Sequence, residues 1–126
     1  MIFLVPWSVD SSFPPGNLTD MWYIDLDSNH LVSTIPSQLG LLHGNLSNVY
    51  LFNNSLTGPI PTELGQLTLV NDLELFDNSL SGRIPSALGQ LTLLDFLFLF
   101  DNHLSGPLPS EIGDVCIDQR SYVINA

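Results

Sequence analysis

The side chains in this chain that could carry out chemistry are carboxylates, three histidines and a single cysteine. Asp25 and Glu74 could form the paired carboxylates of a glycosidase. Cys116 beside a base such as His103 could act as a thiolate nucleophile. However, the sequence pattern places the two carboxylates on an open face with nothing to raise one pKa, and it places His103 and Cys116 on different turns. We therefore predict that the chain is not an enzyme.

The histidines also lack the spacing of a metal site. His30 and His103 each follow an asparagine, and His43 lies in a short insertion. No two of them stand at ligand spacing, so exposed turn histidines are the better interpretation. Because Cys116 is the only cysteine, it allows neither an internal disulfide nor a cysteine cluster. We predict no metal and no cofactor.

The charge of the chain restricts its partners. Its formal net charge is −11, with two arginines and no lysine. This argues against nucleic acid or an anionic membrane, because binding to phosphate needs cationic side chains. A cationic protein or peptide remains possible, although solubility alone would also explain the charge.

Three sequons, at Asn17, Asn45 and Asn53, bear on the cellular address. We predict glycosylation at Asn17 and Asn45 if the chain is secreted, and none at Asn53, where a glycan would crowd a binding face. The apolar N-terminus lacks a basic region and is interrupted by Pro6, so it is a poor signal peptide. It is also too short to cross a bilayer, and no other stretch suggests a span.

The elements that must position these side chains recur along the chain. An asparagine returns at intervals of 25, 24 and 24 residues, as Asn29, Asn54, Asn78 and Asn102. Prolines keep the same intervals, as Pro36, Pro61, Pro85 and Pro109, and so do glycines, as Gly40, Gly65, Gly89 and Gly113. A period of this length is typical of a solenoid, in which each coil buries its apolar face against its neighbours.

One unit shows what each position is expected to do. Leu73 and Leu75, two apart, point to one side of a short strand that pairs with its equivalents in a parallel sheet. Asn78 follows where the chain turns, and its amide is expected to bond backbone groups of its own coil and the next. Gly82 allows a conformation that side chains resist. An apolar residue and Pro85 then begin a helical or irregular turn.

The far side of each coil has its own pattern. A hydroxyl residue follows each proline and could cap the short helical turn: Ser37, Thr62, Ser86 and Ser110. An apolar residue two or three positions further on is expected to fill the core: Leu39, Leu64, Leu88 and Ile112.

The segments NSLTGPIPTELGQLT and NSLSGRIPSALGQLT resemble the plant-type leucine-rich repeat, LxxLxLxxNxLSGxIPxxLGxLT. The resemblance covers about Leu18 to Asp114. It implies an α/β-type solenoid, a right-handed leucine-rich repeat coil with a parallel β-sheet on its concave face and short helical or 3-10 turns on its convex face. Such repeats occur in ectodomains of plant receptor kinases and receptor-like proteins and in polygalacturonase-inhibiting proteins. The resemblance therefore implies an extracellular or cell-surface location.

The repeats divide the chain into three parts. Residues 1–17 are predicted to form a degenerate N-terminal capping coil, with Trp7 in the place of the asparagine. Residues 18–114 hold four repeats, of which the first has Ser33 where glycine is expected. Residues 115–126 are predicted to form an irregular tail or a partial last strand, for which 122–124 is the candidate.

Binding is expected on the concave face, where the residues that flank the core positions form three columns. The first column is Tyr23, Asn48, Asp72 and Phe96. The second is Asp25, Tyr50, Glu74 and Phe98, and the third is Asp27, Phe52, Phe76 and Phe100. Adjacent strands lie about 4.8 Å apart, so the three phenylalanines of the third column should stack. A contiguous exposed aromatic patch is typical of a contact surface.

We predict a non-catalytic module that binds a protein or peptide on this face. The acidic and aromatic side chains there favour a cationic partner with apolar anchors. Four alternatives remain open. Phe96, Phe98 and Phe100 could drive self-association or merely strengthen the strands. The chain could inhibit a secreted wall-degrading enzyme. It could also bind ice through the hydroxyl column of Ser37, Thr62, Ser86 and Ser110.

Overall fold

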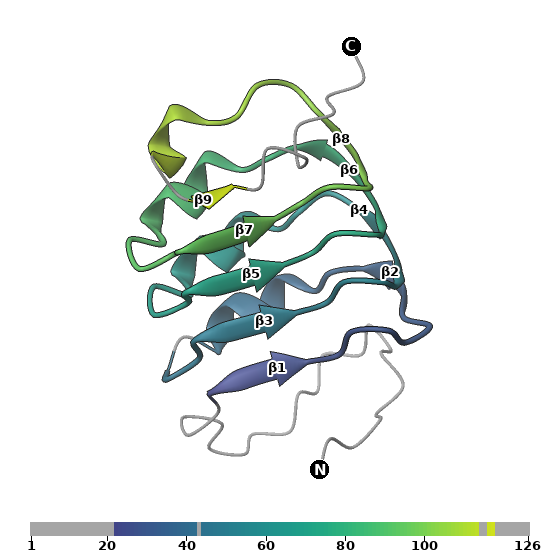
Figure 1. The fold of residues 1–126 in the computed structure, drawn as a ribbon, viewed down its shortest axis with the longest axis horizontal. Coiled ribbons are helices and arrows are strands. Elements are labelled where there is room, and N and C mark those ends of the chain that lie inside the picture. Colours follow the sequence, from purple (N-terminus) through teal and green to yellow (C-terminus); the bar gives the residue numbers. More distant parts are fainter. Residues whose placement is uncertain (1–21, 43, 114–115, 118–126) are drawn as a thin grey trace.

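The computed structural model describes residues 22–42, 44–113 and 116–117, and these form a stack of coils (Figure 1). Each coil contributes one short strand to a parallel front sheet. This sheet has five strands, in the order β1 (Tyr23–Asp25), β3 (Asn48–Tyr50), β5 (Asp72–Glu74), β7 (Phe96–Phe98) and β9 (Cys116–Ile117). Strand order follows chain order because each coil stacks on the one before it, as the periodicity predicts.

A second parallel sheet follows the first around each coil, and the sequence pattern did not predict it. Its four strands are β2 (Val32–Thr34), β4 (Ser55–Gly58), β6 (Ser79–Arg83) and β8 (His103–Ser105), in that order. In β4 and β6 a buried leucine, Leu56 or Leu80, lies among small and polar residues. Glycine and most polar residues have a low propensity for strands, so composition alone does not predict an extended conformation here.

The third side of each coil is a 3-10 turn, which confirms the expected short helical turns. The turns are η2 (Ser37–Leu41), η3 (Thr62–Gln66), η4 (Ser86–Gln90) and η5 (Ser110–Ile112). The predicted side-chain caps are wrong. The N-cap of each turn is the preceding proline, and no side-chain cap hydrogen bond forms. The hydroxyls stand one residue too late, and those of Thr62 and Ser110 donate instead to Glu63 and Glu111.

The core lies between the two sheets and the 3-10 turns. Leu51, Leu75 and Leu99 are buried on adjacent rungs, as predicted, and Leu26 packs against them from a partly buried position in the first described coil. The predicted plugs on the far side are also buried: Leu39, Leu64, Leu88 and Ile112. Leucine thus fills the interior from every side of the coil.

The recurring asparagines form a ladder that joins the coils. Nδ2 of Asn54 donates to Leu51 and Phe52 in its own coil and to the carbonyl oxygen of Leu26, 2.9 Å away. Its Oδ1 accepts from the backbone N–H of Leu31 at 3.0 Å. The sequence predicted that the amide would bond to the next coil, and this is wrong. Its partners outside its own coil, Leu26 and Leu31, belong to the preceding coil.

Ser33→Gly is expected to stabilise the fold by about 1 kcal/mol. Ser33 has φ 81°, which matches the positive φ of the equivalent Gly58, Gly82 and Gly106 and is unfavourable for a side-chain-bearing residue. Urea unfolding followed by circular dichroism would measure the gain. The reciprocal control is Gly82→Ala, where an added Cβ has no neighbour closer than 3.8 Å. It should lose a similar amount, and a neutral result in both variants would contradict the argument.

Two predictions fall on residues outside those that the structure describes. The N-terminal capping coil of 1–17 lies there, and so does the candidate strand of 122–124. In the tail, the described backbone shows β9 pairing in parallel with β7, with Phe96 opposite Cys116.

Candidate ligand-binding face

The front sheet presents the predicted columns across its outer side. Strand register places Tyr23 beside Asn48, Asn48 beside Asp72, and Asp72 beside Phe96. The second column is aligned in the same way, in the order Asp25, Tyr50, Glu74 and Phe98. Residues between the two columns, such as Val49 and Leu73, are buried in the core. The column residues therefore point away from the core, as the period of two requires.

Stacked aromatic rings form the third column, two residues past the end of each strand. The ring centroids of Phe52 and Phe76 lie 4.5 Å apart with an interplanar angle of 7°, and those of Phe76 and Phe100 lie 4.5 Å apart at 16°. Phe98 meets Phe76 and Phe100 edge to face, at 6.5 Å and 6.2 Å. The predicted phenylalanine stack is confirmed. We call the outer side of β1, β3, β5 and β7, with the residue two past each strand, the aromatic face.

These rings pack on one another without becoming buried. Phe52, Phe76, Phe98 and Phe100 are half-buried, and Phe96, the first residue of β7, is 47% exposed. The contacts stabilise neighbouring strands, but the outer surfaces of the rings still meet water. A contiguous aromatic surface of this kind is unusual on a soluble protein unless a partner covers it.

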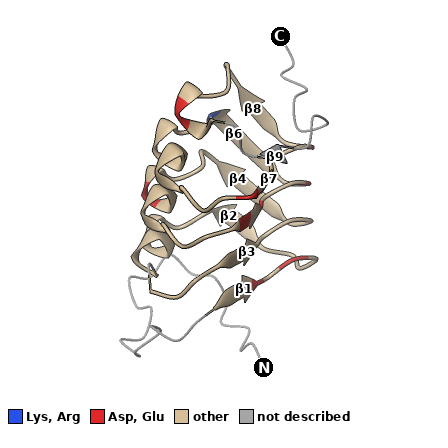
Figure 2. Cartoon of the chain, turned by 60° about the vertical axis from the view of Figure 1, so that its left-hand side comes forward, with Lys and Arg blue, Asp and Glu red and all other residues tan. Residues whose placement is uncertain are grey.

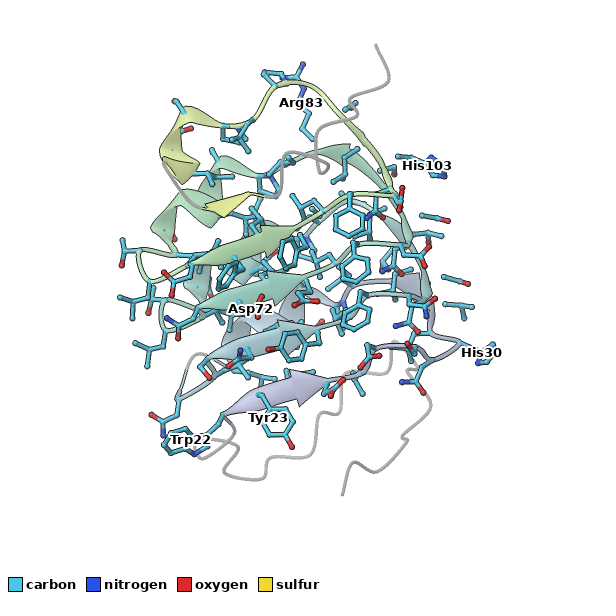
Figure 3. The ribbon with its side chains drawn as sticks, viewed as in Figure 1. Trp22, Tyr23, His30, Asp72, Arg83 and His103 are labelled. Atoms are coloured by element: carbon cyan, nitrogen blue, oxygen red, sulfur yellow. The ribbon has the colours of Figure 1, made fainter. Side chains whose placement is uncertain are left out.

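Polar groups occupy the other half of the aromatic face. Asp72 lies in its middle (Figure 3). Its Oδ2 accepts a hydrogen bond from the hydroxyl of Tyr50 at 3.2 Å, and Tyr50 in turn accepts one from Nδ2 of Asn48 at 2.8 Å. Oδ1 of Asp72 is buried and has no hydrogen-bond partner within the described part of the chain. The register places Glu74 between Tyr50 and Phe98.

The surroundings of these carboxylates alter their pKa values. Burial raises the pKa of Asp72, partly offset by the Tyr50 hydrogen bond. Burial, then repulsion from Asp72, Asp27 and Asp25, raises the pKa of Glu74. The carboxyl groups of Asp25 and Asp27 share a hydrogen bond, which raises the pKa of Asp25 and lowers the pKa of Asp27. The expectation that nothing on this face raises a carboxyl pKa is therefore wrong, because neighbouring side chains partly exclude water from it.

Asp72→Asn is expected to flatten the pH dependence of thermal stability. A raised folded-state pKa contributes stability that is fully present below the unfolded value, about 3.9 for aspartate. That stability is lost as the pH rises through the folded-state pKa. The wild-type melting temperature should therefore fall as the pH rises above about 3.9, and that of the variant should fall less. The lowered pKa of Asp27 works in the opposite direction in both proteins.

Melting curves at several pH values would measure these slopes. Glu63→Gln is the control, since it removes one negative charge on η3 instead. Equal slopes in the wild type and in Asp72→Asn would contradict the assignment.

The residues of both catalytic arrangements weighed from the sequence lie on separate strands. Asp25 and Glu74 lie on β1 and β5 with β3 between them, so two strand spacings, about 10 Å, separate their backbones. The backbone places His103 on β8 and Cys116 on β9, in different sheets. Among the residues described, no three or more His, Cys, Asp and Glu side chains gather as a metal site would require.

Charge is distributed unevenly over the described coils. Acidic segments mark the front strands and the turns that follow them, and others lie on the 3-10 turns (Figure 2). The one described cation, Arg83, lies on β6 in the second sheet. Within the described residues, the carboxylates of the aromatic face therefore have no cationic partner.

Two of the three sequon asparagines lie in the described part of the chain. Asn45 is exposed just before β3. Asn53 is also exposed, in the turn between β3 and β4, where its Nδ2 donates to Oγ of Ser28 at 3.1 Å. Asn17 lies outside the described residues. No described helix combines the length and the apolar composition that a membrane crossing requires.

Parallel strands, 3-10 turns and an asparagine ladder repeated in every coil define a leucine-rich repeat solenoid. A family model described as Leucine Rich Repeat matches residues 45–67 and 70–91. The Arabidopsis thaliana LRR receptor-like serine/threonine-protein kinase GSO2 is 44% identical over 52 residues, which are 41% of this chain and 4% of that protein. The chain thus belongs to the plant-type leucine-rich repeat proteins, and it spans a small part of this curated relative.

Solved structures support the same assignment. The LRR ectodomain of the Arabidopsis thaliana receptor kinase GASSHO1/SCHENGEN3, in complex with CASPARIAN STRIP INTEGRITY FACTOR 2, is 40% identical with a TM-score of 0.73. The match covers 77% of this chain and 12% of that one. A plant ice-binding protein is 33% identical with a TM-score of 0.68, over 74% of this chain and 30% of that one.

Proposed function

We propose that the chain is a non-catalytic recognition module that binds a protein or peptide through its aromatic face. The observation that carries the proposal is the continuous patch of Phe52, Phe76, Phe98 and Phe100, half-buried by mutual contact and open on the outside. Apolar anchors of a partner would cover these rings and release water from them. A similar Arabidopsis structure holds the receptor kinase HAESA in complex with the peptide hormone IDA, which favours a partner of this kind.

The charge of the same face favours a cationic partner. Asp72 and Glu74 lie beside the rings, and no described cation neutralises them. A partner with lysine or arginine next to an apolar anchor would match both halves of the surface. Likeness to receptor-like proteins favours an extracellular or cell-surface location for this binding. In that location the exposed Asn45 is a predicted glycosylation site.

Phe76→Ser is expected to weaken binding at least about tenfold. A displayed library of random peptides would be selected on the wild-type chain, and the dissociation constants of enriched peptides would be measured by calorimetry. Phe76 lies at the centre of the stack, so its loss removes anchoring area from both neighbours. The control is Leu93→Ser, which removes an exposed apolar side chain outside the aromatic face. Equal affinity of the enriched peptides for all three proteins would overturn the proposal.

Self-association through Phe96, Phe98 and Phe100 is tested by light scattering after size-exclusion chromatography. A wild-type dimer that becomes a monomer in Phe98→Ser would identify a second copy of the chain as the occupant of the face. A wild-type monomer leaves the face free for a different partner. Retention of a wall-degrading enzyme on immobilised chain, lost in Phe76→Ser, would identify that partner as an enzyme to be inhibited.

A second candidate function is ice binding. The likeness to a plant ice-binding protein favours it, and so does a column of hydroxyl side chains. Ser37, Thr62, Ser86 and Ser110 are all exposed and each begins a 3-10 turn, so they form one hydroxyl column along the stack. Thermal hysteresis that disappears in Thr62→Val would support this function. Its absence in the wild type would exclude it.

A further inference from the structure

Two carboxylates at the centre of the aromatic face lack compensation. Asp72 and Glu74 flank the buried Leu73 on β5, so both side chains point outward. Asp72 accepts one weak hydrogen bond, from Tyr50, and its Oδ1 has no partner in the described coils. An ionised carboxylate can accept about four hydrogen bonds. Because Oδ1 of Asp72 is buried, the acceptors open to a partner are Oδ2 of Asp72 and the Glu74 carboxylate, which accepts no hydrogen bond among those described. A charged donor gains most in such a partly dehydrated place.

Aromatic groups flank this pair on both sides. The register places Phe96 next to Asp72 and Phe98 next to Glu74 on β7, with the two ring centroids 6.1 Å apart. On β3, the Tyr50 ring lies beside Glu74 and its hydroxyl bonds to Asp72. Ring faces attract cations, and they attract planar ones by stacking as well. The carboxylates on β5 thus lie between the Tyr50 ring on β3 and the Phe96 and Phe98 rings on β7, and we call this place the slot.

The spacing of the two carboxylates distinguishes between cations. Alternate residues of a strand stand about 6.6 Å apart. An ammonium group is a compact point charge and can satisfy one such carboxylate well. A guanidinium group carries five donors in a planar fork and can bond to both while its flat faces lie against rings.

We propose that an arginine side chain of the partner polypeptide binds in this slot, between Tyr50 and the phenyl rings of β7, with its guanidinium on Asp72 and Glu74. This rests on the proposed function, since it assigns one subsite of the aromatic face. The apolar anchor beside the arginine would lie on Phe98 and Phe100. Asp72 and Glu74 are then the residues that determine specificity, and the phenylalanine stack supplies affinity that is less selective.

The test compares three peptides that differ at one side chain: acetyl-Arg-Gly-Phe-amide, acetyl-Lys-Gly-Phe-amide and acetyl-citrulline-Gly-Phe-amide. Citrulline keeps the shape of arginine without its charge. Dissociation constants would come from amide chemical-shift titrations of the full chain. The arginine peptide should bind about tenfold tighter than the citrulline peptide and about threefold tighter than the lysine peptide. The shifts should centre on β5 and β7.

Variants separate the slot from general electrostatics. Asp72→Asn and Glu74→Gln should each weaken the arginine peptide about five- to tenfold and leave the citrulline peptide unchanged. Glu63→Gln on η3 and Asp101→Asn after β7 remove the same charge elsewhere, and they should change binding less than twofold. Acidification should weaken the arginine peptide in the wild type, because Asp72, Glu74, Asp25 and Asp27 lose charge on this face. The phenolic hydroxyl of Tyr50 stays protonated throughout.

Other outcomes would overturn the slot. Equal binding of the three peptides, weakened by Phe98→Ser but not by Asp72→Asn, would remove the arginine subsite and leave the proposed function standing. Equal losses in Glu63→Gln and Glu74→Gln would mean a diffuse charge effect. Failure of all three peptides to bind at millimolar concentration would also overturn the slot. The proposed function would then be tested separately, by the library selection.

Discussion

Asn78→Ala is expected to lower the free energy of unfolding by about 4 kcal/mol, the largest effect of any single polar substitution in the described coils. Asn78 is 9% exposed and its amide makes four hydrogen bonds. Its Oδ1 accepts from the backbone N–H of Leu56 at 3.0 Å. Its Nδ2 donates to three carbonyl oxygens, those of Leu51 at 3.0 Å, Leu75 at 3.1 Å and Phe76 at 3.2 Å. Alanine would leave the Leu56 N–H without its acceptor where water cannot replace the amide. Each of the three carbonyl oxygens would lose one donor and keep another, from Asn54, Asn102 and the Asn53 N–H respectively.

Equilibrium unfolding in urea would measure this loss, and Asn29→Ala is the matched control. Asn29 holds the equivalent position in the first described coil, but it is partly exposed. Its Nδ2 donates only to Leu26 and Asp27 of its own coil among the interactions described. We expect a cost of about 1 kcal/mol there. Similar losses at both positions would contradict a ladder that works by joining coils.

Asn78→Asp adds a second comparison, because its size is nearly unchanged. The carboxylate could still accept from Leu56, but it could not donate, and it would face three carbonyl oxygens. We expect it to destabilise the fold at least as much as alanine at neutral pH. A tolerated aspartate would mean that the donor half of the amide contributes little.

Gly65→Ala is expected to cost about 3 kcal/mol, although it adds only one methyl group. Gly65 is buried in η3, and a Cβ built on it would fall inside van der Waals contact with the carbonyl oxygen of Ala87 on η4. The obstacle is backbone, so no side chain can move aside, and the two coils would have to separate. Gly40 and Gly89 meet Glu63 and Glu111 in the same way.

Thermal and urea unfolding would test this expectation against Gln66→Ala, one residue further along the same turn. Gln66 is exposed, and its replacement should change stability by less than about 0.5 kcal/mol. If Gly65→Ala proves as mild as Gln66→Ala, the coils can separate at this point without loss, and the close approach of η3 to η4 is not required. A Gly65→Ala variant without a cooperative transition would meet the expectation.

The recurring residues predict much of the fold from local properties alone. The interval of the asparagines predicted a stack of coils, and the pair Leu73 and Leu75 predicted a strand with one buried side. The stacked rings of Phe52, Phe76 and Phe100 followed from the same register. Each inference needed only the repeat length and the alternation of side chains along a strand, which are local properties.

Other features depended on contacts between coils. The glycines at 40, 65 and 89 were visible as a repeat, but their reason, a neighbouring backbone, was not. The second sheet was missed because its polar strands are held by pairing with equivalents rather than by composition. The direction of the asparagine bonds depended on which coil presents a free acceptor.

The sequence by itself determined the period, the buried leucines and the set of side chains on the outer face, because periodicity and alternation act along the chain. Only the tertiary structure decided that Asp72 and Glu74 are partly dehydrated beside Tyr50 and Phe98. Burial and electrostatics depend on what surrounds a group in space, and these neighbours come from coils more than twenty residues apart.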